Sequence, residues 1–193
     1  MRATSGEAQA GAEWDRLAEA LNRYGVCHIA PLTKPRGAVP SDPVGLLLRL
    51  AKASDVRLQE AAILLLLTHP KLAPAAQDAI SRLGGVQRDR AMRRYIAASA
   101  LQRMWRTRIS LALGRPASEV LIPPAYLDIL RLPPLEEDYG RATLRALAAD
   151  EEARYGYDAW AGYTSLMDLF LAEIGLQGWG QRSDELRRRA RTG

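Results

Sequence analysis

The chain has 193 residues, with 48% hydrophobic and 25% charged residues and a formal net charge of +5. This composition excludes a disordered chain, and the single cysteine, Cys27, excludes an internal disulfide framework. Leu and Ala far outnumber Ile and Val, which favours an all-α fold over a large sheet.

The organisation expected from these patterns is one all-α domain of seven to eight helices around a long central helix. This domain spans residues 13–178, includes a proline-rich loop at 26–43, and is flanked by a flexible N-terminal tail (1–12) and a basic C-terminal tail (179–193). The longest apolar run, Ala61 to Leu67, is far shorter than the ~20 residues that span a bilayer. No membrane span is therefore expected, and the single cysteine favours a location in the reducing cytoplasm.

Residues typical of helix starts and ends occur at several positions in the first half of the chain. Apolar residues at helical spacing begin near Trp14 and stop at Gly25, a residue type common after helix ends. Asp42 and Asp55 are suited to cap the helices that follow them, and the second of these is apolar nearly all round, as expected for the core. Helices are predicted over residues 13–24, 43–53, 54–68 and 74–83.

The longest helical pattern covers residues 87–113, without an internal Gly or Pro, and would extend about 40 Å. It is apolar over most of its circumference, so it is predicted to be the central helix. Further helices are predicted over residues 126–131, 136–154 and 157–174.

A narrow polar stripe remains on this central helix and is the candidate binding surface. Its members are Arg88, Ser99, Gln102, Arg103, Arg106 and Ser110. Arginine side chains can bind phosphates or carboxylates in a bidentate geometry, so the stripe could contact a partner protein or a nucleic acid. The acidic segment 136–173 of the same chain could instead pair with these arginines.

Histidines are scarce, with only His28 and His69 present. Arg23 and His28 have an R-x4-H spacing that resembles the ribonuclease motif of the helical HEPN family, which implies a pair that positions a scissile phosphate. In this chain Gly25 interrupts the motif, so a loop histidine is the competing interpretation. Cys27 is interpreted as a small buried hydrophobic residue, and His69 as a residue at the C-terminus of a helix.

Two acidic triplets, 136–138 and 150–152, contain ligand types for hard divalent cations, but consecutive carboxylates on a helix point in different directions. Gly84-Gly85 lacks the Lys-Ser/Thr of a phosphate-binding loop. No cofactor and no metal are expected.

The segment from Ser54 to Pro70 and the sequence YIAASALQRMWRTR (95–108) resemble an uncharacterised family of helical prokaryotic proteins. Members of this family are encoded beside small nucleotidyltransferases, in pairs that look like toxin–antitoxin modules. The resemblance implies that this chain is the non-catalytic, antitoxin-like subunit and that a nucleotidyltransferase is its partner.

The sequence therefore predicts a non-enzymatic interaction protein with a protein partner, and homo-oligomers are compatible with it. The first alternative is a nucleic-acid-binding protein that uses the arginine-rich helix and the basic tail. The second alternative is a HEPN-like ribonuclease built on Arg23 and His28.

Overall fold

The computed structural model describes residues 5–34, 37–114 and 120–192, and all regular secondary structure in these ranges is helical. The all-α prediction is therefore confirmed. The helices are α1 (Ser5–Arg23), α2 (Pro43–Lys52), α3 (Val56–Thr68), α4 (Ala73–Ser81), α5 (Gly85–Met104), α6 (Arg106–Ala112), α7 (Leu127–Leu130), α8 (Arg141–Tyr155) and α9 (Ala159–Thr192), with short 3-10 helices η1 (Pro70–Leu72) and η2 (Glu137–Gly140).

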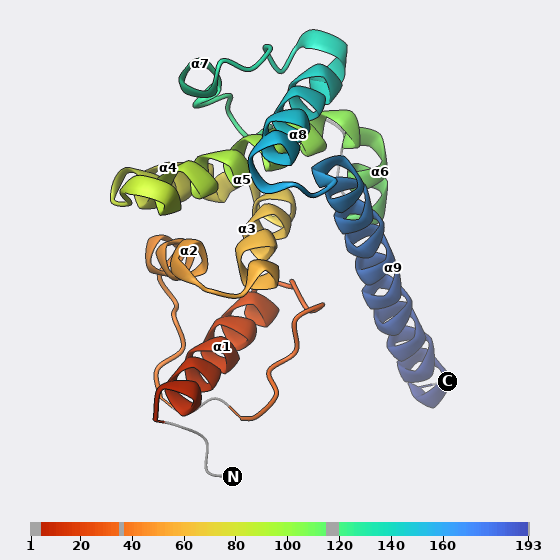
Figure 1. The fold of residues 1–193 in the computed structure, drawn as a ribbon. Helices are drawn as coiled ribbons and strands as arrows, with labels where there is room; N and C mark the ends of the chain where they lie inside the picture. The colour runs from red at the N-terminus through yellow and green to blue at the C-terminus, as the bar shows by residue number, and fades with distance from the viewer. Residues whose placement is uncertain (1–4, 35–36, 115–119, 193) are drawn as a thin grey trace.

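Helix α5 is the central element, as predicted. It contacts α2, α3 and α4 on one side and α8 and η2 on the other, and α9 descends from the α6 and α8 region (Figure 1). Its residues from Tyr95 to Gln102 are all buried, so the core surrounds this part of the helix. No helix in the described ranges has the length and apolar character that a bilayer crossing would need.

The predicted capping residues begin their helices. The Asp42 side chain accepts a hydrogen bond from Gly45 N at 2.7 Å, and Asp55 accepts one from Arg57 N at 2.8 Å. Each carboxylate satisfies a backbone donor that has no partner within the first helical turn. Helices α2 and α3 consequently start where the sequence indicates.

The single helix predicted over residues 87–113 is wrong, because the chain bends at Trp105 between α5 and α6. The backbone of Trp105 has φ −110° and ψ 16°, outside the helical region. The bend allows α6 to pack against α9, and Ile109 on α6 is buried. No Gly or Pro marks this position, since the bend follows from packing between segments far apart in the sequence.

The helix predicted from Glu136 begins only at Arg141. Asp138, Tyr139 and Gly140 have φ values of 47°, 55° and 85°, in the left-handed region, and they place the chain against α5. A Cβ atom on Gly140 would lie 2.9 Å from the carbonyl oxygen of Ala100, so the close approach requires glycine.

The boundaries of both predicted tails also differ from the structure. Helix α1 begins at Ser5, within the predicted tail 1–12, and α9 continues through Gly178 and Gly180 to Thr192. Two glycines lower helix propensity without ending a 34-residue helix. Residues 1–4 and 193 of the predicted tails lie outside the described residues.

Arg93, a buried residue of α5, connects α5 to α8 by ion pairs. Its side chain is only 1% exposed, and its Nε lies 2.9 Å from a carboxylate oxygen of Asp89, one turn earlier. Its Nη1 lies 2.6 Å from a carboxylate oxygen of Asp150 on α8. The predicted pairing of the arginine-rich segment with the acidic segment therefore occurs at Arg93, which is not a member of the stripe.

A second buried carboxylate, Glu151, connects α8 to α9. It is 2% exposed and accepts hydrogen bonds from Tyr163 Oη at 2.8 Å and from Tyr157 Oη at 3.3 Å. Burial and the nearby Glu151 carboxylate raise the pKa of Tyr163 well above its usual value. The Tyr163 hydroxyl therefore remains a donor to Glu151.

We expect the substitution Tyr163→Phe to lower the free energy of unfolding by about 1–3 kcal/mol, because it removes a donor from a buried carboxylate. Tyr157→Phe is the matched control, since this residue is 47% exposed and its hydrogen bond is longer. The control should cost no more than about 0.5 kcal/mol. Urea denaturation measures the free energy of unfolding of both variants. An equal decrease in the two would contradict the role of Tyr163 as the main donor to Glu151.

Candidate functional site

The centre of the predicted polar stripe is covered by another segment of the chain. Ser99 and Gln102 are buried, and both bind the segment that passes over α5 after residue 119. Ser99 Oγ donates to Ile122 O at 3.1 Å, Gln102 Nε2 donates to Val120 O at 3.1 Å, and Ile122 N donates to Gln102 Oε1 at 2.6 Å. Arg103 Nη1 also donates to Ile122 O, at 3.1 Å. These side chains satisfy backbone groups that have no helical partner.

The prediction of one exposed stripe is therefore wrong. Arg88 and Arg106 are exposed, but they lie beyond opposite ends of the closed centre, and Ser110 is buried on α6. Helical periodicity places these residues on one face, but it carries no information about the segment that covers that face. Arg103 binds backbone oxygens and forms no ion pair with the acidic segment in the described part of the chain.

An open cavity of about 530 Å³ lies at the bend between α5 and α6, and we call it the arginine cavity. Its lining comes from the end of α5, from α6, from η2 and from the start of α8. The lining residues are Arg103, Met104, Trp105, Arg106, Thr107, Arg108, Tyr139 and Arg141.

The electrostatics of this cavity are dominated by its four guanidinium groups. The Arg108 guanidinium carbon lies 4.8 Å from the centroid of the Trp105 ring, in a cation–π contact. Burial lowers the pKa of Arg103, and the nearby Glu136 carboxylate opposes this shift. Among the described residues, no carboxylate forms an ion pair with any of the four arginines.

A second pocket opens between α2, α3, α4 and α5, and we call it the apolar pocket. Alanines 51, 62, 76, 79 and 91 and the larger side chains of Leu47, Leu66, Ile80 and Leu83 form its apolar walls. Its space is about 30 Å³, enough for the end of one side chain, whereas pockets for organic ligands usually have about 300–1,000 Å³.

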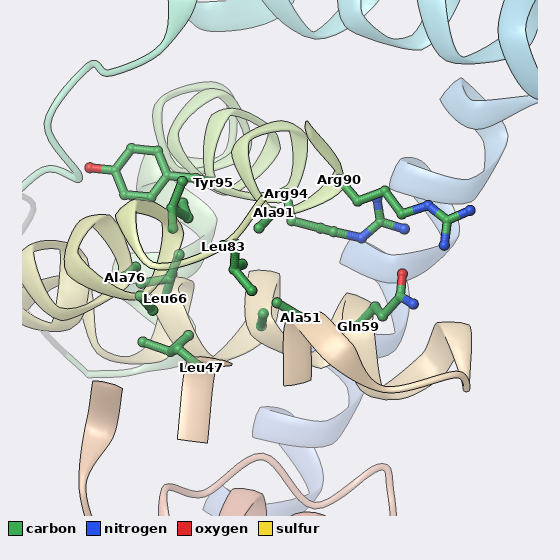
Figure 2. A pocket seen from close by; sticks show the side chains of 13 residues that line it. Leu47, Ala51, Gln59, Leu66, Ala76, Leu83, Arg90, Ala91, Arg94 and Tyr95 are labelled. Carbon is green, nitrogen blue, oxygen red and sulfur yellow. The ribbon is translucent and has the colours of Figure 1, made fainter. Parts of the chain in front are cut away.

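Polar side chains gather at one end of the apolar pocket. Figure 2 shows Arg90 and Arg94 extending on the same side of the pocket as Gln59, with Tyr95 at the opposite side. Arg90 is exposed and has no ion-pair partner in the described ranges, and Arg94 Nε is buried and donates to no described group. Burial raises the pKa of Glu60, and the nearby Arg94 charge offsets this only partly.

The two residues of the HEPN-like motif do not form a pair. Arg23 Nε lies 3.4 Å from Glu19 on the exposed side of α1, whereas His28 Nδ1 lies 3.5 Å from a carboxylate oxygen of Glu173 on α9. Burial lowers the pKa of His28, although the Glu173 charge opposes this. His28 is thus a partly buried loop histidine, in agreement with the competing interpretation.

The structure contradicts the prediction for Cys27 and confirms the one for His69. Cys27 is exposed, so its interpretation as a buried residue is wrong, since the loop buries its neighbours Val26 and Ile29 instead. Partial burial and the Glu173 charge raise the pKa of the Cys27 thiol, which disfavours a nucleophilic thiolate. His69 ends α3 as predicted, and its Nε2 lies 2.7 Å from Tyr24 O.

The acidic triplets also do not converge on one point. Among the residues that the structure describes, no group of three or more potential ligands is arranged to hold a metal ion. Glu151 is instead buried against two tyrosines, and Asp150 pairs with Arg93 and Arg154.

Comparisons with protein-family models, with curated proteins and with solved structures find no match to this chain. The resemblance to the helical prokaryotic family therefore remains a hypothesis that rests on the sequence segments alone.

Several site residues were not predicted from the sequence. Arg90 and Arg94 line the apolar pocket but are not among the predicted binding residues, and Arg141 and Tyr139 lie in a segment predicted to be one continuous helix. Gly140 is the signal in the sequence for this turn, because glycine adopts positive φ angles at little steric cost.

Proposed function

We propose that this protein is a non-enzymatic interaction module that binds a protein partner at the apolar pocket. The observation that carries the proposal is an apolar pocket with two arginines at its edge, of which Arg90 has no carboxylate to pair with in the described chain. Apolar contacts with charged groups at the rim are typical of protein–protein interfaces.

The size and charge of the pocket indicate which side chains the partner segment must carry. The small space suits a branched aliphatic side chain, and the two arginines suit a carboxylate on the same segment. An amphipathic helix with Leu or Ile and with Asp or Glu one turn away has both groups on one face. The resemblance in the sequence implies that this partner is a small nucleotidyltransferase.

A capture experiment with paired variants tests the proposal. The tagged protein is purified from its native host, washed at about 0.5 M salt, and the eluted proteins are identified by mass spectrometry. We expect a stoichiometric partner that withstands the salt and is lost, by about tenfold or more, with Arg90→Glu, because the reversed charge repels the carboxylate. Ala62→Leu, which fills the pocket, should have the same effect.

Arg88→Glu is the matched control, because Arg88 is exposed on the same helix and does not line the pocket. The partner should be retained with this variant. Equal loss with both charge reversals would indicate non-specific attraction to a basic helix and would contradict the proposal.

A nucleic-acid-binding function is the second candidate and is supported by the exposed Arg106, Arg108 and Arg141 near two aromatic rings. It predicts nucleic acid in the eluate at low salt that disappears at about 0.5 M salt. The closed centre of the stripe disfavours it, since no continuous basic surface follows α5.

A further inference from the structure

The arginine cavity concentrates more positive charge than one carboxylate could neutralise. Arg106 and Arg108 are exposed, and of the four lining arginines only Arg103 donates hydrogen bonds from its side chain to other described residues, through Nη1. Three or four guanidinium groups around one cavity match the charge of a diphosphate or triphosphate group.

Two aromatic side chains also line the cavity, and they differ in how accessible their rings are to a ligand. Trp105 has the Arg108 guanidinium against its ring, whereas Tyr139 is 79% exposed. The left-handed backbone at Tyr139 and the contact of Gly140 with Ala100 fix this residue beside α5. An exposed ring next to guanidinium groups offers a surface on which a planar base can stack.

The size of the cavity favours a small ligand over a polymer. The volume of about 530 Å³ lies in the range that is usual for organic ligands.

We infer that the arginine cavity binds a nucleoside diphosphate or triphosphate, with the phosphates on Arg106 and Arg141 and the base against Tyr139. This site is separate from the apolar pocket and does not depend on the proposed partner. The same chemistry is present at the end of a nucleic-acid strand, so the experiment must distinguish a free nucleotide from an oligonucleotide.

Isothermal titration calorimetry of the full chain tests the inference with five types of probe. The probes are the four common ribonucleoside triphosphates, their diphosphates, adenosine, inorganic tripolyphosphate and a single-stranded RNA octamer. We expect at least one nucleotide to bind about tenfold or more tightly than both tripolyphosphate and adenosine, because phosphate and base contacts act together.

Variants then locate the site. Arg106→Gln with Arg141→Gln should weaken nucleotide and tripolyphosphate binding by about 100-fold, because both lose charge-assisted contacts. Tyr139→Asn should weaken nucleotide binding alone, and asparagine tolerates the left-handed backbone. Arg88→Gln, outside the cavity, should change neither affinity, and thermal melting confirms that each variant is folded.

Four results would overturn the inference. These are the absence of binding by every nucleotide, equal affinity for nucleotides and tripolyphosphate, tighter binding of the RNA octamer than of any nucleotide, and unchanged affinity in the Arg106 and Arg141 double variant. The third result would indicate that the arginine cavity binds nucleic acid.

Discussion

Removal of both carboxylates that pair with Arg93 is expected to lower the free energy of unfolding by about 3–5 kcal/mol. The double substitution Asp89→Ala, Asp150→Ala leaves a guanidinium that is 1% exposed without the two ion-pair partners that the structure shows. Its charge would remain buried, because the Arg93 side chain extends from α5 toward α8 and is almost fully covered.

The control for this prediction is Arg93→Met, which removes the buried charge and retains an apolar side chain of similar length. We expect it to cost less than the double substitution, because Asp89 and Asp150 are 28% and 42% exposed and remain hydrated. Urea denaturation at pH 7 measures both variants. A larger loss for Arg93→Met would show that packing of the arginine stem, rather than burial of its charge, determines the effect.

The same ion pairs give a pH dependence whose sign follows from the pKa of Asp150. Burial raises this pKa, but the hydrogen bonds and charges of Arg93 and Arg154 together outweigh that effect, so the net shift is downward. The stabilisation is therefore present above the unfolded value near 3.8 and is lost as the pH falls through the lower folded value. The difference in the free energy of unfolding between the wild type and the double variant should therefore become smaller at acidic pH.

Gly140→Ala is the second substitution with a large expected effect. A left-handed backbone costs a residue with a Cβ atom about 1–2 kcal/mol, and overpacking against Ala100 adds about 1–3 kcal/mol. The new Cβ would lie 2.9 Å from Ala100 O and 3.1 Å from Ala100 Cα. Both atoms belong to the backbone of α5, which cannot shift without disturbing the core.

Gly156→Ala separates the two contributions. Gly156 also has a positive φ, 72°, but no heavy atom lies within 4 Å of its added Cβ. The control should lose only the backbone contribution of about 1–2 kcal/mol. If thermal and urea denaturation give the same loss for both variants, the close approach to α5 does not contribute to stability.

Local sequence signals predicted the helices that begin at capping residues. Asp42 and Asp55 act through backbone groups two or three residues away, so the information that positions α2 and α3 is contained in the adjacent residues. The long apolar pattern likewise predicted that α5 is central, because a helix without a wide polar face must be surrounded.

The candidate site was less predictable from the sequence. Arg103 and Arg106, two members of the predicted stripe, line the arginine cavity, whereas Ser99 and Gln102 were assigned to the surface and are buried under residues 120–122. Arg90 and Arg141 were not selected, because their importance depends on neighbours contributed by other helices.

The amino-acid sequence by itself determined the helical class, the order of the helices and the capped starts of α2 and α3, since these depend on composition and on contacts within one or two turns. Only the tertiary structure decided the bend at Trp105, the covering of the stripe and the meeting of Arg106 with Arg141. These features depend on contacts between residues distant in the chain, and helical periodicity does not specify which segment packs against a given face.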